Sequence, residues 1–277
     1  MEENKDGSKD EKRDDKKESK APGKDFKRNY GVQRAPESKD MVFGIRPVEE
    51  LFKSENEIEK MFFDKGQSNL QDLIREAKIR QIPHSFVPIE KLNSITRKNH
   101  QGVICFISPV RYQKLDNLLI NIFEQGRIPL ILVLDRITDV RNFGAIARTA
   151  EVAGVDAIVI PTRGSAQISA DAVKTSSGAL SYIPICREEN LKTSLSFLKD
   201  SGLQLMGCTE KGGDYLFKLD FTGPLAIIMG SEEDGISDEY LKMCDHKVSI
   251  PMTGKVASLN VSVAAGVIIY EAIRQRM

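Results

Sequence analysis

The sequence contains no tryptophan, and its few cysteines are widely separated. Because no two of them form a CxxC pair, a structural zinc site and a disulfide framework are both disfavoured. No run of 18 apolar residues occurs, and the N-terminus has no apolar stretch typical of a secretory signal. These absences predict a protein of the reducing cytoplasm that binds no metal and does not span a membrane. The cysteines are Cys105, Cys186, Cys208 and Cys244.

Two common nucleotide-binding signatures are also missing. No GxGxxG follows the first apolar run of the C-terminal half, and no GxxxxGK[ST] occurs anywhere in the chain. A P-loop is therefore excluded, and a dinucleotide-binding Rossmann site is disfavoured.

Charge is balanced over the whole chain but not along it. The 277 residues include 40 basic and 40 acidic side chains, so a strongly basic nucleic-acid clamp is excluded as a property of the whole protein. Fifteen of the first 20 residues are charged, and we expect residues 1–40 to be a disordered tail because they cannot bury enough apolar area. The alternative for this tail is weak contact with RNA phosphates. Residues 41–115 carry 12 basic and 9 acidic side chains, which still allows a local basic patch.

The remaining chain divides into two α/β regions. Residues 41–115 have the mixed strand and helix patterns of a small α/β unit, and residues 116–128 are expected to be a linker with a short amphipathic stretch. From residue 129 to 277, continuous apolar runs alternate with helical patterns, which predicts a parallel sheet covered by helices on both faces. Ligands of such sheets bind beyond the carboxyl ends of the strands. The predicted strands are 129–135, 157–160, 182–185, 203–206, 225–229 and 247–250.

Three loops that follow predicted strands carry unusual polar residues. They are Asp139–Ala150, Met229–Ser237 and Ile250–Ala264. The second loop contains three consecutive acidic residues, which would repel a phosphate. A ligand there should be neutral or cationic, or should offer hydroxyl groups to a carboxylate.

These loops, in this order and at these strand ends, resemble those of the SpoU (TrmH-like) RNA ribose 2′-O-methyltransferases. The resemblance covers about residues 41–277. Gly44–Glu49 and Asn99–Gly102 resemble parts of the ribosomal-protein-like RNA-binding domain that precedes the catalytic domain in the branch acting on guanosine in 23S rRNA.

The resemblance implies properties that the residue pattern alone could not show. The family has a SPOUT-type α/β fold with a C-terminal trefoil knot, a feature too rare to propose from propensities. It uses S-adenosylmethionine as its cofactor and works as a homodimer whose active sites combine residues of both subunits. The implied partner is large-subunit rRNA, with tRNA as the alternative.

The family's cofactor positions fall on Gly230, Ile250 and Leu259, with Thr209 and Glu210 in a neighbouring loop. Glycine would let the backbone approach the ligand closely. Two apolar side chains could enclose an adenine while backbone groups bind its edge.

The family's catalytic positions fall on five polar residues, and each also has a purely local explanation. Asn142 suits a helix N-cap, Arg148 could be a solvated arginine paired with Glu151, and Glu232 would favour a helix N-terminus. Ser258 and Asn260 could cap the last helix. In the first region, the polar cluster before a predicted strand is either an exposed loop or an RNA contact. The catalytic candidates are Asn142, Arg148, Glu232, Ser258 and Asn260, and the RNA-binding candidates are Arg97, Lys98, His100 and Gln101.

Two residues depart from the family pattern. Val140 occupies a position where the family usually has proline, and Glu233 one where it often has glycine. Val140 should change only the stiffness of its loop, whereas Glu233 adds a charge beside the predicted site.

The implied reaction is in-line transfer of a methyl group from a sulfonium to a ribose 2′-hydroxyl. The resemblance implies that Arg148 activates this hydroxyl. It would act either as a base, a role to which a guanidinium that keeps its proton is poorly suited, or as a fixed cation that stabilises a developing alkoxide. The alternatives are a tRNA enzyme, an adenosine-directed rRNA enzyme of the antibiotic-resistance type, and a non-catalytic RNA-binding assembly factor on the same scaffold.

Overall fold

The computed structural model describes residues 40–210, 213–256 and 258–277. Of the predicted disordered tail, residues 1–39 lie outside the described residues. No helix in the described part of the chain is long and apolar enough to cross a membrane.

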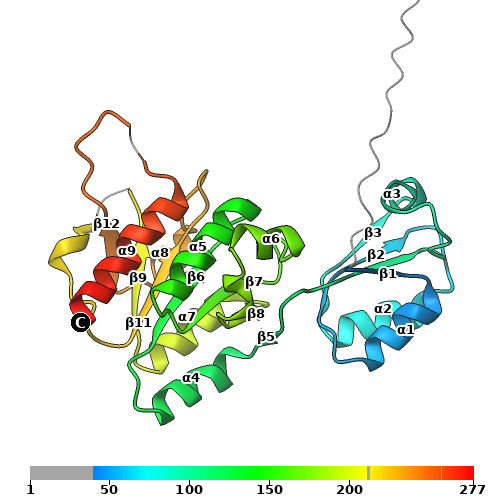
Figure 1. Cartoon of the computed structure of the whole chain (residues 1–277), viewed down its shortest axis with the longest axis horizontal. Helices are drawn as coiled ribbons and strands as arrows, with labels where there is room; N and C mark the ends of the chain where they lie inside the picture. The colour runs from blue at the N-terminus through cyan, green and yellow to red at the C-terminus, as the bar shows by residue number, and fades with distance from the viewer. Residues whose placement is uncertain (1–39, 211–212, 257) are drawn as a thin grey trace, which may run out of the picture. The chain divides into compact units, whose positions relative to one another are not determined.

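The first described region contains a mixed four-stranded sheet in the order β1-β4-β2-β3 (Figure 1). Strand β2 is antiparallel to β4 and parallel to β3. Alternate residues Met61 and Phe63 of β2 are fully buried against helices α1 and α2, as expected for a strand with one face on a core. The elements are β1 (Met41–Phe43), α1 (Ile45–Lys53), β2 (Ile58–Asp64), α2 (Gln71–Ile79), β3 (His84–Val87), α3 (Ile89–Ile95) and β4 (Val103–Ile107).

The second sheet has eight strands, and every neighbouring pair in it is parallel. Its strand order is β10-β12-β9-β11-β6-β7-β8-β5. The strands are β5 (Tyr112–Gln113), β6 (Leu130–Leu134), β7 (Ala157–Pro161), β8 (Ile185–Glu188), β9 (Gln204–Cys208), β10 (Asp214–Tyr215), β11 (Leu225–Met229) and β12 (His246–Ser249).

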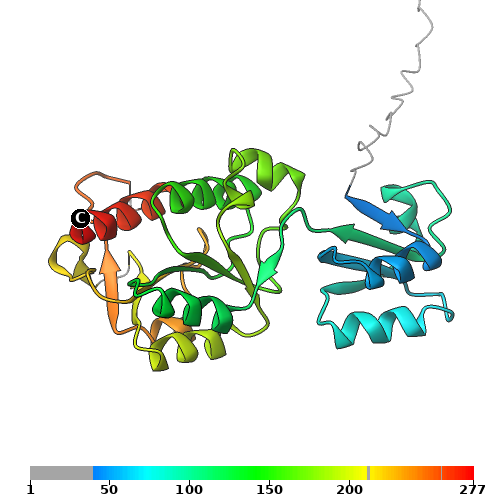
Figure 2. The same ribbon diagram turned by 60° about the horizontal axis from the view of Figure 1, so that its bottom comes forward.

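Helices cover both faces of this sheet, as the unbroken apolar strands predict. Figure 2 shows α5 in green and α9 in red along one face, and α4 and α7 along the other. Each face has its own apolar core. The helices are α4 (Leu115–Glu124), α5 (Val140–Val152), α6 (Ala170–Thr175), α7 (Leu191–Asp200), α8 (Asp238–Leu241) and α9 (Val261–Arg276), with 3₁₀ turns at Ala179–Ser181 and Leu216–Lys218.

The strand order places a switch point beside β6. Strand β6 has β7 on one side and β11 on the other, although β11 follows it by about 90 residues in the chain. The loops that leave β6 and β11 therefore start side by side and run to opposite faces. This is the position where open parallel sheets bind ligands.

Two expectations from the sequence differ from the structure. The segment 116–128 was expected to be a linker, but most of it belongs to α4, whose Leu118, Leu119 and Ile122 are buried in one core of the large sheet. The strand expected at 182–185 begins instead at Ile185. Tyr182 and Ile183 donate backbone hydrogen bonds to Ala179 and so close the preceding 3₁₀ turn.

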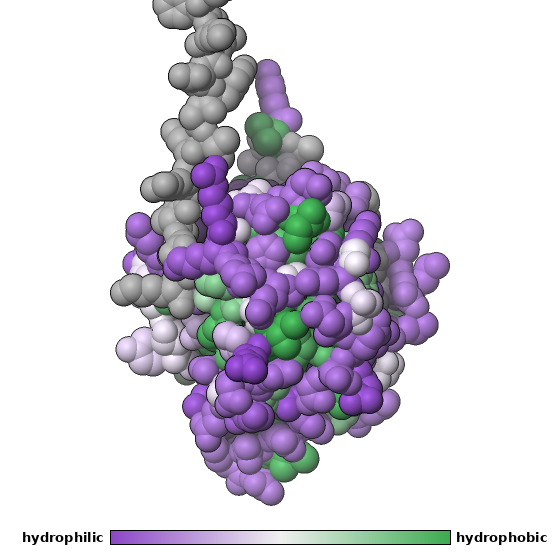
Figure 3. All heavy atoms as spheres, turned by 90° about the vertical axis from the view of Figure 1, so that its right-hand side faces the viewer, coloured by the Kyte–Doolittle hydropathy of each residue, from purple (hydrophilic) through white to green (hydrophobic). Residues whose placement is uncertain are grey.

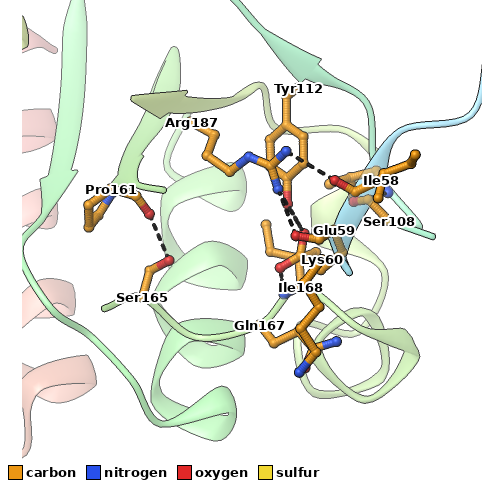
Figure 4. A network of polar contacts seen from close by, with 11 residues as sticks. Ile58, Glu59, Lys60, Ser108, Tyr112, Pro161, Ser165, Gln167, Ile168 and Arg187 are labelled. Carbon is orange, nitrogen blue, oxygen red and sulfur yellow. Dashed lines mark hydrogen bonds and ion pairs between the residues drawn. The ribbon is translucent and has the colours of Figure 1, made fainter. Parts of the chain in front are cut away.

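A polar network centred on Glu59 of β2 links the small sheet to the large one (Figure 4). The Glu59 carboxylate accepts hydrogen bonds from Tyr112 Oη, from Arg187 Nη1 at 3.2 Å and from the backbone N of Ile168 at 3.1 Å. The Arg187 guanidinium also lies 3.9 Å from the centre of the Tyr112 ring. Burial, together with the negative charge of Glu59, raises the pKa of Tyr112, so its hydroxyl remains a donor.

Candidate active site

A cavity of about 290 Å³ opens at the carboxyl ends of β9, β11 and β12. Its walls combine apolar side chains with backbone of the loops after these strands, a mixture typical of small-molecule sites. All five predicted cofactor positions line it, although they come from three separate loops. The residues that line the cavity include Thr209, Glu210, Gly230, Glu232, Ile250, Ser258, Leu259 and Asn260.

Glycine is required at position 230 for a reason that the sequence did not suggest. A Cβ atom there would lie 2.0 Å from the backbone C of Gly235 and 2.1 Å from the backbone N of Ile236. Ser231 and Gly235 exchange backbone hydrogen bonds of 3.2 and 3.0 Å, which closes a short hairpin over Gly230. The hairpin therefore requires glycine at position 230, whether or not a ligand also approaches the backbone there.

Three of the predicted catalytic residues form a polar bridge at the rim of the cavity. Asn260 Nδ2 donates to Glu232 Oε1 at 2.7 Å and to Asn142 Oδ1 at 3.0 Å. The backbone N of Val261 also donates to Glu232 Oε1, at 3.4 Å. Within the described ranges, Glu232 Oε2 and Asn142 Nδ2 have no partner, so the bridge keeps one free acceptor and one free donor.

Helix capping explains part of this geometry. Asp139, and not Asn142, is the N-cap of α5, because its side chain accepts from the backbone N of Arg141 and Asn142, both at 2.8 Å. Asn142 therefore lies in the first turn with its side chain free to join the bridge. Asn260 is both a cap and a bridge residue, since its Oδ1 accepts from Ser262 N at 3.0 Å. That bond fixes which end of the amide faces Glu232.

Arg148 lies apart from this bridge. It is exposed on α5, six residues after Asn142, which corresponds to about 240° around a helix of 3.6 residues per turn. It lines neither the cofactor-sized cavity nor the cavity described next. Among the described residues it has no hydrogen-bond or ion-pair partner, so the pair with Glu151 that was the local alternative to a catalytic role does not form. The chain by itself does not bring Arg148 to the other four candidates.

A second cavity, of about 400 Å³, lies on the other side of the bridge. Asn142 and Glu232 line it together with four other charged residues, Arg136, Asp139, Glu233 and Asp234. Sequence analysis missed Arg136 and its neighbour Asp135, which directly follow β6. The sequence held a signal for Asp135 alone, because this residue stands at the end of a continuous apolar run. The structure adds that Asp135 is only 3% exposed, a position where a carboxylate needs partners.

The predicted RNA-binding cluster divides into two kinds of residue. Arg97 and Lys98 are exposed, and Lys98 Nζ lies 5.9 Å from the Phe43 ring centre. His100 is only 6% exposed, and its Nε2 and Nδ1 bind Asn93 Oδ1 at 3.0 Å and Gly102 N at 3.1 Å. In this structure the His100 ring holds a turn, and the RNA contact expected of the cluster stays a prediction. Gln101 is exposed, but its Oε1 accepts from Ile45 N at 2.9 Å.

The one face of the molecule drawn in Figure 3 is mostly hydrophilic, with hydrophobic residues showing between the polar ones.

Metal and thiol chemistry find no support at the site. In the part of the chain that the structure describes, no three His, Cys, Asp or Glu side chains are grouped as metal ligands. Cys208 lines the cavity, and burial raises the pKa of its thiol, so it is not a thiolate nucleophile at neutral pH.

Comparison with known proteins identifies this arrangement. Residues 129–270 match the SpoU rRNA Methylase family, and residues 41–113 match the family described as RNA 2′-O ribose methyltransferase substrate binding. The chain belongs to the SpoU rRNA methylase family. The matched ranges contain all of the predicted site residues.

Relatives of similar length support this assignment. The chain is 36% identical to the "Putative TrmH family tRNA/rRNA methyltransferase YacO" of Bacillus subtilis over 241 residues, 86% of this chain and 96% of that protein. It is 35% identical to the "23S rRNA (guanosine-2′-O-)-methyltransferase RlmB" of Photobacterium profundum, over 86% of this chain and 99% of that protein. A solved structure of the SpoU methyltransferase AviRb from Streptomyces viridochromogenes, in complex with AdoMet, is 26% identical. Its TM-score is 0.54, and the match covers 85% of this chain and 90% of that one.

Proposed function

We propose that this protein transfers a methyl group from S-adenosylmethionine to a ribose 2′-hydroxyl in RNA, with a guanosine of 23S rRNA as the target. The observation that carries the proposal is the polar bridge of Asn142, Glu232 and Asn260 at the rim of the cavity. It sits in a chain whose family consists of SpoU methylases.

The residues around the cavity fit the proposed cofactor. Ile250 and Leu259 supply apolar walls for an adenine, and the exposed Glu210 carboxylate can accept hydrogen bonds from hydroxyl or amino groups. Gly230 lines the cavity and has no side chain that would project into it. When bound, S-adenosylmethionine supplies a methyl group on a positively charged sulfur. A carboxylate rim suits that charge.

The bridge residues would orient the accepting hydroxyl. Glu232 Oε2 can accept the hydroxyl proton in a hydrogen bond, and Asn142 Nδ2 can donate to a second ribose oxygen. Because Asn260 holds both side chains in place, the two groups are preorganised, which removes part of the orientation cost of the reaction. Ser258, exposed at the same rim, is assigned to substrate contact.

Arg148 is assigned to the active site of a partner subunit. It is exposed and unpaired within the described ranges, and α5 directs it away from the bridge of its own chain. In a homodimer, its fixed positive charge would stabilise the developing alkoxide of the ribose in the partner's site. The proposal therefore includes a homodimer. It also includes the family's C-terminal trefoil knot, which would hold the 250–260 loop beside the loops after β9 and β11.

The RNA substrate is assigned from the first region. Residues 41–113 match a substrate-binding family, and exposed Arg97 and Lys98 suit contact with a phosphate backbone. The relative RlmB is named a 23S rRNA guanosine methyltransferase, which favours that substrate over tRNA and over an adenosine target. Such an enzyme would act in the cytoplasm, where the rRNA is.

The experiment is methyl transfer by the purified protein, with isotope-labelled S-adenosylmethionine, to 23S rRNA and to bulk tRNA lacking the modification. Mass spectrometry of RNase fragments then locates the label. The proposal predicts one labelled guanosine ribose in 23S rRNA. Label confined to tRNA, or on an adenosine, would overturn the substrate assignment. Absence of S-adenosylmethionine binding by calorimetry would favour a non-catalytic assembly factor.

A further inference from the structure

Arg136 combines two unusual properties at the switch point of the large sheet. It directly follows Asp135 at the end of β6, and its backbone φ of 61° lies in the left-handed region that side chains other than glycine rarely occupy. Backbone strain of this kind persists only where surrounding contacts hold it, and it is concentrated at functional sites.

The guanidinium of Arg136 is engaged on three sides. Its Nε and Nη2 contact the two oxygens of the Asp135 carboxylate at 3.1 and 3.3 Å. Its Nη1 donates to Asp234 Oδ2 at 3.0 Å, and Nη2 also donates to the backbone O of Gly235 at 3.1 Å. Asp135 extends the contact, because its Oδ2 accepts from the backbone N of Ser237 at 2.8 Å. Together, Asp135 and Arg136 bind three residues within the segment 234–237.

That segment closes the hairpin carrying Glu232. The hairpin has backbone bonds between Ser231 and Gly235, and Ser231 Oγ accepts from Asp234 N at 3.1 Å. Arg136 does not contact Glu232, but it fixes the base from which Glu232 reaches Asn260. Its positive charge also offsets the repulsion among the neighbouring carboxylates, which would otherwise spread the hairpin.

We propose that Arg136 is a positioning residue, whose guanidinium fixes the 231–235 hairpin and thereby holds Glu232 against Asn260. This inference rests on the proposed function, because it assigns a role to Arg136 in the same site. We infer that the strained, left-handed backbone of Arg136 lets its guanidinium contact both Asp135 at the end of β6 and the hairpin.

The test uses Arg136→Gly, since glycine adopts the observed φ without strain while removing every guanidinium contact. We expect kcat for RNA methylation by the folded protein to fall about tenfold or more, because Glu232 is no longer held in place. The melting temperature should fall as well, because the buried Asp135 carboxylate loses its cation. KM for RNA should change less than about threefold. Added guanidinium ion at non-denaturing concentration should restore part of the activity, and Arg136→Lys should retain more activity than Arg136→Gly.

Ser177→Gly is the matched control, because Ser177 is also a non-glycine residue in the left-handed region, with φ of 53°, and has no part in the proposed site. It should leave kcat unchanged. A double variant, Arg136→Gly with Asp234→Asn, should lose no more activity than Arg136→Gly alone, because both changes break the same contact.

Three kinetic results would overturn the inference. One is a kcat of Arg136→Gly within about threefold of the unmodified protein. Another is additive loss in the double variant. The third is a higher KM for RNA with a weaker salt dependence at unchanged kcat, which would make Arg136 a phosphate ligand instead.

Hydrogen exchange separates this inference from the proposed function. Arg136→Gly should speed exchange at the amides of Gly235 and Ser237, whether or not the protein methylates RNA. If the unmodified protein transfers no methyl group, the proposed function fails while the exchange measurement still decides whether Arg136 holds the hairpin. Unchanged exchange at both amides would contradict it.

Discussion

Two glutamates, Glu59 on β2 and Glu232 after β11, each join segments that are far apart in the sequence. The Glu59 side chain is only 10% exposed, and its partners include the cationic Arg187 at 3.2 Å. Glu232 is exposed, and its partners are the side-chain amide of Asn260 and the backbone N of Val261. Both are glutamates with more than one donor, yet their surroundings differ in burial and in charge.

This difference separates a structural carboxylate from a candidate catalytic one. A buried carboxylate must be compensated by a cation and by hydrogen bonds, and both oxygens of Glu59 are occupied. An exposed carboxylate needs no such compensation, and Glu232 leaves Oε2 available to a ligand. The residue type is the same in the two cases, so burial, the charge of the partners and the free oxygen of Glu232 make the distinction.

The largest expected effect is on the structural side of the comparison. Glu59→Ala should lower the free energy of unfolding by about 3–5 kcal/mol, because it leaves the buried Arg187 without its carboxylate. Urea denaturation followed by circular dichroism measures this. Glu55→Ala is the matched control, since its pair with Arg111 is exposed at both ends and should contribute less than about 1 kcal/mol. Equal losses in the two variants would contradict the distinction by burial.

Arg148→Ala should have the largest effect on the catalytic side. Removing a preorganised charge that stabilises a developing oxyanion lowers kcat by about 100- to 1,000-fold. The melting temperature should hardly change, because Arg148 is exposed and has no partner in the described part of the chain. Steady-state methylation and differential scanning fluorimetry measure the two quantities. Near-normal turnover by the folded variant would refute the assigned role.

An intermediate effect is expected at the backbone beneath Glu232. Gly230→Ala would place a Cβ 2.0 Å from Gly235 C, so the hairpin must shift and deform the cavity wall. We expect affinity for S-adenosylmethionine, measured by calorimetry, to fall about tenfold or more. At Gly223 a Cβ would meet nothing within 4 Å, so Gly223→Ala should bind the cofactor normally. Unaltered binding by Gly230→Ala would show that the hairpin does not shape the cavity.

The smallest effect concerns a third carboxylate, Glu271 of α9. Hydrogen bonds from Arg274 and Gln275 lower the pKa of Glu271 to about 2 from an ordinary value of 4.5. Because its folded-state pKa is depressed, Glu271 stabilises the fold above pH 4.5, and this contribution is lost as the pH falls towards 2. Glu271→Gln should therefore be less stable than the unmodified protein near neutral pH, with the gap closing in acid. A gap that does not change with pH would contradict the assigned ionisation.

Much of the fold could be predicted because buried parallel strands read as apolar runs. Strands such as β6 and β11 are fully buried and were expected at their observed positions. The sequence did not reveal that α4 packs on the large sheet. An amphipathic stretch indicates that one face of a helix is buried, but it does not indicate which element covers that face. The start of β8 was placed too early because residues 182–183 are as apolar as a strand. In the structure these two residues close a 3₁₀ turn instead.

The site was predictable where its residues lie at strand ends and less so where contacts cross between loops. Asn142, Glu232 and Asn260 were candidates through family resemblance, and the distances among them come from the structure alone. His100 seemed available for RNA because its neighbours are polar, but burial is not visible in a local polar pattern. Arg136 was missed because a left-handed arginine cannot be read from the sequence.

The most direct test of the account is the rate of 23S rRNA methylation by Glu232→Gln at saturating S-adenosylmethionine, measured with its melting temperature and beside Glu59→Gln. Glutamine keeps the shape of the side chain but removes the charge that would accept the hydroxyl hydrogen bond. The account predicts that Glu232→Gln loses at least about tenfold in rate with an unchanged melting temperature, while Glu59→Gln melts at lower temperature and keeps its rate when folded. A normal rate in Glu232→Gln would contradict the claim that the Asn142–Glu232–Asn260 bridge is the methyl-transfer site.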